Sequence, residues 1–261
     1  MYIEFMKKSF QQKFIYRINT YIQIIGTFIV FFININVWEA LYNGKEAIKG
    51  ITLGDMITYI VISTFVQRLS RSNVAYEIAS KVKDGSIGIE LMKPINIKYY
   101  FIFNDLGNNF FYSLFITFPA AIVISVIYDF RIDIDFLQLF MFLICLFLGI
   151  YLMFCIHYIF GLLAFWFQTG EYVAFFTRAC MTLFSGSTIP LWFYPKTLYS
   201  ISVMLPFRLV NYEPIQIYLE KISYDEAFRI IFMQIIWIIL LLVLEKIMWS
   251  HVQNKIVIQG G

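Results

Sequence analysis

The chain is organised around one charged stretch, which reads AYEIASKVKDGSIGIELMKP from Ala75 to Pro94. It lies within the longest charged insert between two hydrophobic runs, which extends from Arg68 to Lys98 and carries six lysines and arginines. The first half has the pattern of a short charged helix, a turn with two glycines follows, and a second short segment is stopped by the proline. We therefore predict a helical hairpin that lies outside the hydrophobic part of the structure.

The rest of the composition is that of a membrane protein. Of its 261 residues, 60% are hydrophobic and 14% are charged, and the mean hydropathy is +0.73, whereas globular domains are about 45–50% apolar. The hydrophobic residues form continuous uncharged runs, which predict helices, because a barrel would alternate polar and apolar residues in roughly 10-residue segments. The net charge of +3 is too small to predict a nucleic-acid partner. We expect an all-α, polytopic membrane protein that forms a single domain over residues 1–261.

Six hydrophobic runs predict six transmembrane helices. They extend over Tyr21–Trp38, Ile51–Leu69, Tyr99–Tyr128, Phe136–Gly161, Tyr172–Phe184 and Asp225–Trp249. The uncharged run 136–169 has 34 residues. As one helix it would extend about 50 Å, which is too long for a hydrocarbon core of about 30 Å. We therefore predict an interfacial turn at 162–171, and we expect Pro119 to kink the third helix.

Two further segments depart from simple spanning helices. Residues 1–20 place four basic side chains among phenylalanines and isoleucines, which predicts an amphipathic helix in the headgroup region; the alternative is a disordered basic leader. Residues 185–214 are apolar but hold four of the six prolines, so no straight helix can cross the bilayer there. An apolar segment with a broken backbone predicts a re-entrant hairpin. The residues expected to shape this hairpin are Gly186, Pro190, Pro195 and Pro206.

Basic residues predict the orientation. With six spans both termini lie on one side, and that side carries twelve lysines and arginines: four in the leader, six in the charged insert and two near the C-terminus. The opposite side carries six. Because basic loops stay on the cytosolic side, we expect cytosolic termini, a cytosolic hairpin and an external re-entrant segment.

The sequence contains no recognisable catalytic or metal-binding motif. The two histidines have no serine or cysteine at a catalytic spacing, and no phosphate-binding loop occurs, so ATP would have to be bound by another protein. The three cysteines lie in hydrophobic runs and are interpreted as packing residues. Charged residues in or beside the spans are candidates for lining a path, with a position at the headgroup level as the alternative. These candidates are Asp105, Glu171 and Arg178.

Taken in order, these features resemble the permease subunits of ABC-2 type exporters. The resemblance rests on the amphipathic N-terminal helix, the cytosolic hairpin, the re-entrant stretch Gly186-x-x-x-Pro190-Leu and the cytosolic termini. The stretch from Lys83 to Pro94 and the terminal Gln259-Gly-Gly261 are similar to a bacterial subgroup in which two related permeases accompany one ATPase. The likeness covers essentially the whole chain.

The resemblance implies that residues 70–98 couple the permease to two copies of an ABC ATPase, which would bind ATP and Mg²⁺. The coupling residues would be Glu77, Lys81, Val82, Lys83, Asp84, Gly85, Ile87, Leu91 and Pro94. In this interpretation Ile78, Val82 and Ile87 fill a groove of the ATPase while exposed charged neighbours form ion pairs with it. A solvated surface loop is the alternative.

The resemblance also implies an exporter of the bacterial plasma membrane, for an amphipathic, drug-like, lipid-like or peptide solute, with the re-entrant segment as its external gate. It implies a heterodimer with a second permease, with a homodimer as the alternative; lipid is a further partner, and no cofactor is expected in this chain. Two other function classes stay open. A gradient-driven carrier or channel would need carboxylates in the middle of the spans, which the sequence lacks. A membrane scaffold would bind a partner without transporting a solute.

Overall fold

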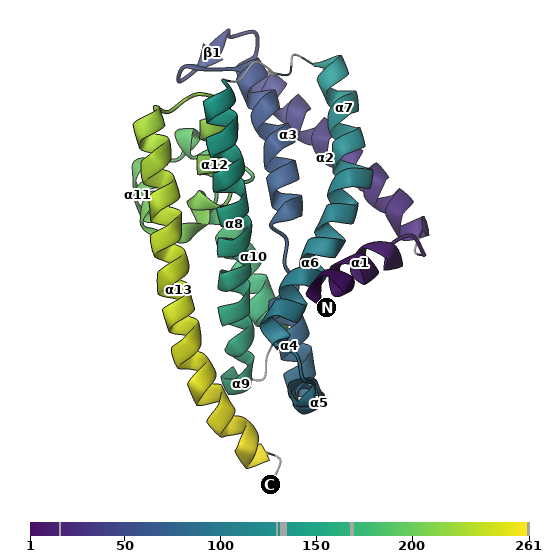
Figure 1. Cartoon of the computed structure of the whole chain (residues 1–261). Helices are drawn as coiled ribbons and strands as arrows, with labels where there is room; N and C mark the ends of the chain where they lie inside the picture. Colours follow the sequence, from purple (N-terminus) through teal and green to yellow (C-terminus); the bar gives the residue numbers. More distant parts are fainter. Residues whose placement is uncertain (16, 129, 131–134, 168–169, 260–261) are drawn as a thin grey trace.

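The computed structural model describes residues 1–261 except for residue 16, residue 129 and the segments 131–134, 168–169 and 260–261. Helices dominate the fold (Figure 1). The α-helices are α1 (Tyr2–Gln12), α2 (Arg17–Tyr42), α3 (Leu53–Leu69), α4 (Val74–Lys83), α5 (Ile87–Met92), α6 (Ile97–Tyr112), α7 (Phe118–Ile127), α8 (Phe136–Leu162), α9 (Ala164–Phe167), α10 (Gly170–Phe184), α11 (Lys196–Met204), α12 (Tyr212–Tyr218) and α13 (Tyr224–Gln259). Shorter elements are the π turn η1 (Ser113–Thr117), the 3-10 turns η2 (Leu191–Phe193) and η3 (Pro206–Leu209), and the antiparallel strands β1 (Ala47–Ile48) and β2 (Ile51–Thr52).

Four helices in the described part of the chain are long and apolar enough to cross a membrane. They cover Arg17–Tyr42, Ile97–Ile127, Phe136–Phe167 and Tyr224–Gln253. Helix α3 has 17 residues and α10 has 15, so both are short for a hydrocarbon core of about 30 Å. The chain is therefore a multi-pass helical membrane protein, while the six spans and the re-entrant hairpin stay predictions.

Local capping sets where the predicted second span begins. The Thr52 hydroxyl oxygen accepts a hydrogen bond from the Asp55 amide at 3.1 Å, and the Asp55 carboxylate accepts one from the Thr52 amide at 3.2 Å. This capping box satisfies two amides at the helix start. Helix α3 begins at Leu53 instead of Ile51, because Ile51 and Thr52 pair with β1. The first predicted span is longer than expected and begins at Arg17.

The structure changes helix geometry near both predicted features, although Ile97–Ile127 and Phe136–Phe167 each still count as one long apolar helix and the kink at Pro119 stays a prediction. The π turn η1 separates α6 from α7, and Pro119 lies in the first turn of α7. Proline has no amide hydrogen, and its ring would clash with the backbone one turn earlier in a regular helix. The wider π turn directly before Pro119 gives the ring room. The second feature follows the fourth predicted span, where α8 ends at Leu162 and α10 begins at Gly170.

Helix α8 forms the centre of the core. Cys145, Leu152 and Leu162 on this helix are completely buried. Helix α13 runs beside it (Figure 1), and the Gln234 amide of α13 donates to the Cys145 carbonyl at 2.9 Å. The three cysteines are free. Cys145 lies in the main apolar cluster, which agrees with its interpretation as a packing residue, and Cys155 is completely buried. Because α8 is covered on several sides, its sequence is an almost continuous apolar run.

The predicted hairpin and the predicted re-entrant segment lie in opposite halves of the molecule (Figure 1). Helices α4 and α5 lie in the half that contains the end of α13, whereas α11 and α12 lie in the half that contains β1.

Near the N-terminus α1 runs across α6, where Phe5 packs edge-on against Tyr100 and Phe10 against Phe111. The N-terminal segment is thus helical and packed, and the alternative of a disordered leader is wrong over Tyr2–Gln12.

Candidate functional site

The predicted hairpin is built from α4 and α5. Helix α4 buries one face, made of Val74, Ala75, Ile78 and Ala79, in an apolar cluster that includes Leu162 of α8. Apolar residues at these spacings lie on one side of a helix. The hairpin is therefore fixed to the main body by an apolar stripe.

A glycine of α8 allows this close packing. A Cβ atom at Gly161 would lie 3.0 Å from the Ile78 Cδ1 atom and 3.1 Å from the Ala75 Cα atom. Both distances are shorter than ordinary van der Waals contact, so a larger residue would push α4 away from α8. The backbone of α4 approaches α8 here because position 161 has no side chain.

Charged groups hold α5 against α4. The Glu90 carboxylate accepts hydrogen bonds from Lys81 at 2.9 Å and from Lys93 at 2.7 Å, and these bonds, Lys93 first, lower the pKa of Glu90. In the connecting turn the Asp84 carboxylate accepts from the Ser86 hydroxyl at 2.6 Å and from the Ser86 amide at 2.9 Å, which lowers the pKa of Asp84. The predicted turn residue between these two is Gly85, which has φ +77°.

The expected division of the hairpin into inner and outer residues needs a correction. Ile78 is 2% exposed and Ile87 is 8% exposed, so both are buried in this chain and cannot fill a groove of a partner. Val82 and Leu91 pack against the same cluster and are half-buried. The sequence pattern indicated the right helices but did not indicate which apolar face would meet α8.

The outer face of the hairpin carries a different set of residues. Tyr76, Ile89 and Met92 are 51%, 61% and 77% exposed, and the charged or turn residues Lys83, Asp84, Gly85 and Pro94 are also exposed. Glu77 is half-buried, and burial raises the pKa of its carboxyl. Sequence reasoning missed Tyr76, Ile89 and Met92. Ile87 and Leu91 are four residues apart and therefore share the inner face of α5, so Ile89 and Met92 point away from that face. This spacing is the sequence signal that could have identified Ile89 and Met92 as outer residues.

At the other end, residues 185–218 form a proline-rich segment. Each predicted proline lies at the start of a short helix: Pro206 is in the first turn of η3, whereas Pro190 and Pro195 are the extended residues directly before η2 and α11. Proline suits a first turn because its φ is already helical and its missing amide hydrogen would have no partner there. The broken backbone is confirmed, while the entry of the segment into the membrane stays a prediction.

Hydrogen bonds anchor the proline-rich segment to α3. The Tyr59 hydroxyl donates to the Gly186 carbonyl at 2.7 Å, and the Ser63 hydroxyl donates to the Ser187 carbonyl at 3.0 Å. The Asn211 amide donates to the Ser63 oxygen at 3.0 Å. Gly186 has φ +74°, and a Cβ there would lie 2.6 Å from the Leu191 Cδ1 atom. Glycine is therefore required at this position by both its backbone angle and its surroundings.

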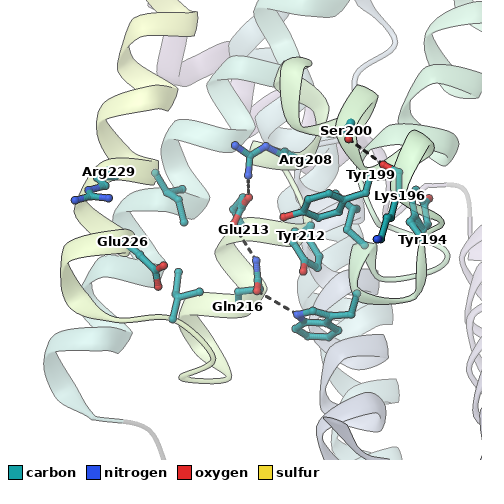
Figure 2. Close-up of a pocket in the computed structure, with 14 residues that line it drawn as sticks. Tyr194, Lys196, Tyr199, Ser200, Arg208, Tyr212, Glu213, Gln216, Glu226 and Arg229 are labelled. Atoms are coloured by element: carbon teal, nitrogen blue, oxygen red, sulfur yellow. Dashed lines mark hydrogen bonds and ion pairs between the residues drawn. The ribbon is translucent and has the colours of Figure 1, made fainter. Parts of the chain in front are cut away.

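A pocket of about 680 Å³ lies between the proline-rich segment and α13 (Figure 2). In its wall Arg208 forms an ion pair with Glu213, Gln216 donates to Glu213 at 2.9 Å, and Trp192 donates to Gln216 at 3.2 Å. Sequence reasoning did not assign these residues to a site, because they are scattered over the segment. The other residues that line the pocket are Leu191, Tyr194, Lys196, Tyr199, Ser200, Tyr212, Ile222, Glu226, Arg229 and Ile230.

The three charged residues proposed to line a path are not brought together by any contact among the described residues. Asp105 is 8% exposed, accepts a hydrogen bond from the Ser72 hydroxyl at 2.5 Å, and borders a small cavity of about 160 Å³. Arg178 is exposed on α10. The side chain of Glu171 lies outside the described residues, as do Gly260 and Gly261. Within the described part of the chain, no three His, Cys, Asp or Glu side chains are grouped as a metal site would require.

The long apolar helices define a multi-pass membrane protein, and α4 and α5 form a helical hairpin between two of them. The model of a family described as ABC-2 family transporter protein matches residues 28–260, and the chain belongs to this family. No curated protein and no solved structure matches in the corresponding comparisons. As a member of this family, the chain is a membrane permease of an ABC transporter, and such permeases work with an ABC ATPase.

Proposed function

We propose that the chain is a permease subunit of an ATP-driven exporter and that the α4–α5 hairpin is the surface that docks with the ATPase. The observation that carries the proposal is the construction of the hairpin. Its inner face is fixed to α8 through Ile78 and Gly161, and its outer face leaves Ile89 and Met92 uncovered. A rigid element with uncovered apolar anchors suits a partner that must transmit force.

Charged residues around these anchors support the same surface. Lys83 and Asp84 lie exposed at the tip of the hairpin, where they can pair with a complementary rim on a partner and orient it. In this proposal ATP and Mg²⁺ are bound by two ATPase subunits, and a second related permease completes the membrane part. Since the ATPase is cytosolic, the hairpin and both termini face the cytosol, and the solute is expelled from the bacterial plasma membrane.

The docking role predicts different effects for two equally exposed methionines. Met92 in the hairpin and Met204 at the end of α11 are each 77% exposed. The chain is co-expressed with its ABC ATPase, and the ATPase that co-purifies is measured for the Met92→Glu and Met204→Glu variants. We expect Met92→Glu to weaken the association by about tenfold, because burial of an unpaired charge at an anchor opposes docking.

The control variant Met204→Glu should keep the ATPase at the wild-type level. Transport is then measured for both variants in membranes that contain the assembled complex, and export should fall only for Met92→Glu. Equal ATPase association for the two variants would contradict the docking role of the hairpin, and transport by the purified chain without any ATPase would replace the proposal with a gradient-driven carrier.

A further inference from the structure

The pocket between the proline-rich segment and α13 has the size of a small-molecule site. Its volume of about 680 Å³ falls within the range of roughly 300–1,000 Å³ that ligand pockets have. Apolar side chains of Leu191, Trp192, Ile222 and Ile230 line one part of it. The remaining lining residues are polar or charged, so the pocket suits an amphipathic molecule rather than a wholly apolar one.

The pocket lining carries three cations, Lys196, Arg208 and Arg229, against two carboxylates, Glu213 and Glu226. Glu213 is occupied by Arg208 and Gln216, and Glu226 accepts hydrogen bonds from the Ser223 amide at 3.1 Å and the Ser223 hydroxyl at 3.4 Å. Lys196, Arg229 and Glu226 form no ion pair among the residues that the structure describes, so one positive charge is in excess in the lining. Lys196 and Arg229 come from α11 and α13, and Figure 2 shows them on either side of the Arg208–Glu213 pair. The pocket can therefore attract an anion.

Tyr212 supplies a hydroxyl donor in the wall of the same pocket. Tyr212 is only 4% exposed, it lines the pocket, and its hydroxyl makes no hydrogen bond within the described part of the chain. Figure 2 shows the Tyr212 and Tyr199 side chains between the Arg208–Glu213 pair and Lys196. A ligand oxygen that reaches Tyr212 would satisfy this donor.

We propose that this pocket binds the anionic headgroup, a phosphate or a carboxylate, of an amphipathic molecule. The headgroup lies between Lys196 and Arg229 and accepts a hydrogen bond from Tyr212. The apolar part of the molecule follows α13, where Met233 and Ile236 continue from Arg229 at spacings of four and seven residues and are 36% and 41% exposed. Residues at these spacings share one helix face. The site goes beyond the docking of an ATPase, because binding here requires only the permease.

Direct binding to the full-length purified chain tests the proposal. In a neutral detergent, the chain is titrated with dioctanoyl phosphatidic acid and with dioctanoylglycerol, which has the same acyl chains but no phosphate, and bound molecules are counted by native mass spectrometry. We expect the phosphatidic acid to bind and the neutral lipid to bind much more weakly. A third titration with inorganic phosphate distinguishes a free anion from a lipid headgroup: displacement of the lipid shows that phosphate alone is recognised, and lack of displacement shows that the acyl chains are needed.

Three variants locate the bound headgroup. Lys196→Gln combined with Arg229→Gln should weaken the binding of phosphatidic acid by about tenfold, and Tyr212→Phe, which keeps the ring, should weaken it by about threefold. The control is Lys45→Gln, an exposed lysine near β1 that does not line the pocket, and it should bind like the wild type. Equal binding of the neutral lipid, or wild-type affinity in the Lys196/Arg229 double variant, would overturn the proposal.

Discussion

The α4–α5 hairpin and the proline-rich segment both pack on the helical body through apolar side chains, but the proline-rich segment is also held by hydrogen bonds to α3. The hairpin rests on α8 through an apolar stripe that includes Ile78, and the Lys81–Glu90 pair joins its own two helices. The proline-rich segment is attached to α3 through hydrogen bonds of Tyr59 and Ser63 to its backbone carbonyls. Apolar contacts have little directional preference, whereas hydrogen bonds weaken steeply when their geometry changes.

This difference suits the two roles proposed here. A hairpin that transmits force from a partner must stay in place on α8, and its close packing at Gly161 keeps it there. A segment that forms the wall of a binding pocket must keep its backbone in one place, and its hydrogen bonds to α3 do so. The effects of single substitutions on stability should therefore differ between the two regions.

The largest effect is expected at Gly186. Replacement by alanine places a Cβ on a residue with φ +74° and 2.6 Å from the Leu191 Cδ1 atom. The unfavourable backbone angle and the crowding together should destabilise the fold by about 2–4 kcal/mol, which thermal unfolding of the protein in nanodiscs would show as a lower midpoint. The control is Gly88→Ala in the hairpin, where no atom lies within 4 Å of the added Cβ, and it should be neutral or slightly stabilising. Equal midpoints for the two variants would contradict the special environment of Gly186.

The sequence predicted local features of both regions well. The hairpin was expected from Ala75 to Pro94, and α4 and α5 extend from Val74 to Met92. Gly186 was singled out and has a positive φ. These features depend on signals within a few residues, such as helix periodicity, glycine turns and proline stops, which one sequence contains in full.

The sequence did not predict contacts between distant segments. Nothing near Ile78 indicates that it will meet Gly161, so the buried face of the hairpin was assigned to a partner. In the same way, Lys196 and Arg229 line one pocket only because α11 and α13 both pack against η3. Such pairings depend on how helices dock, and amphipathic periodicity alone does not determine this when most residues are apolar.

A second substitution tests the hydrogen-bonded attachment of the proline-rich segment. Asn211 is completely buried, and its side-chain amide donates to the Ser63 oxygen. Asn211→Ala removes this donor and leaves a buried oxygen with one partner fewer, which should destabilise the segment by about 1–3 kcal/mol. Thermal unfolding and the rate of proteolysis within 185–218 would measure the change.

Asn36→Ala is the matched control for Asn211→Ala. Its amide also donates one hydrogen bond, to the Phe32 carbonyl, but the residue is exposed on α2 and the carbonyl keeps its helical partner. Loss of the Asn36 hydrogen bond should therefore change the unfolding midpoint little. A larger effect at Asn36 than at Asn211 would mean that buried hydrogen bonds do not fix the proline-rich segment, and the contrast between the two regions would disappear.

The smallest effect is expected from the charged pairs of the hairpin, and it depends on pH. Because Lys93 and Lys81 lower the pKa of Glu90, this carboxylate stabilises the folded hairpin above its ordinary pKa of about 4.3, and the contribution is lost as the pH falls through the lowered value. The pairs are partly exposed, so the contribution should be less than about 1 kcal/mol. Hydrogen–deuterium exchange of α5, corrected for the intrinsic rate, should rise on acidification in the wild type and respond less in Glu90→Gln.

Two neighbouring carboxylates sharpen this pH test. Burial raises the pKa of Glu77, so protonation of Glu77 favours the folded hairpin as the pH falls and opposes the effect of Glu90. The Ser86 hydrogen bonds lower the pKa of Asp84. Protonation of Asp84 therefore destabilises the folded hairpin, as protonation of Glu90 does, but the effect is local to the connecting turn. Glu4→Gln is the control, because its pair with Lys7 has the same three-residue spacing and is about 60% exposed on both sides. If Glu4→Gln changed the pH response of α1 as much as Glu90→Gln changes that of α5, the pairing that fixes α5 to α4 would be no stronger than an ordinary surface contact.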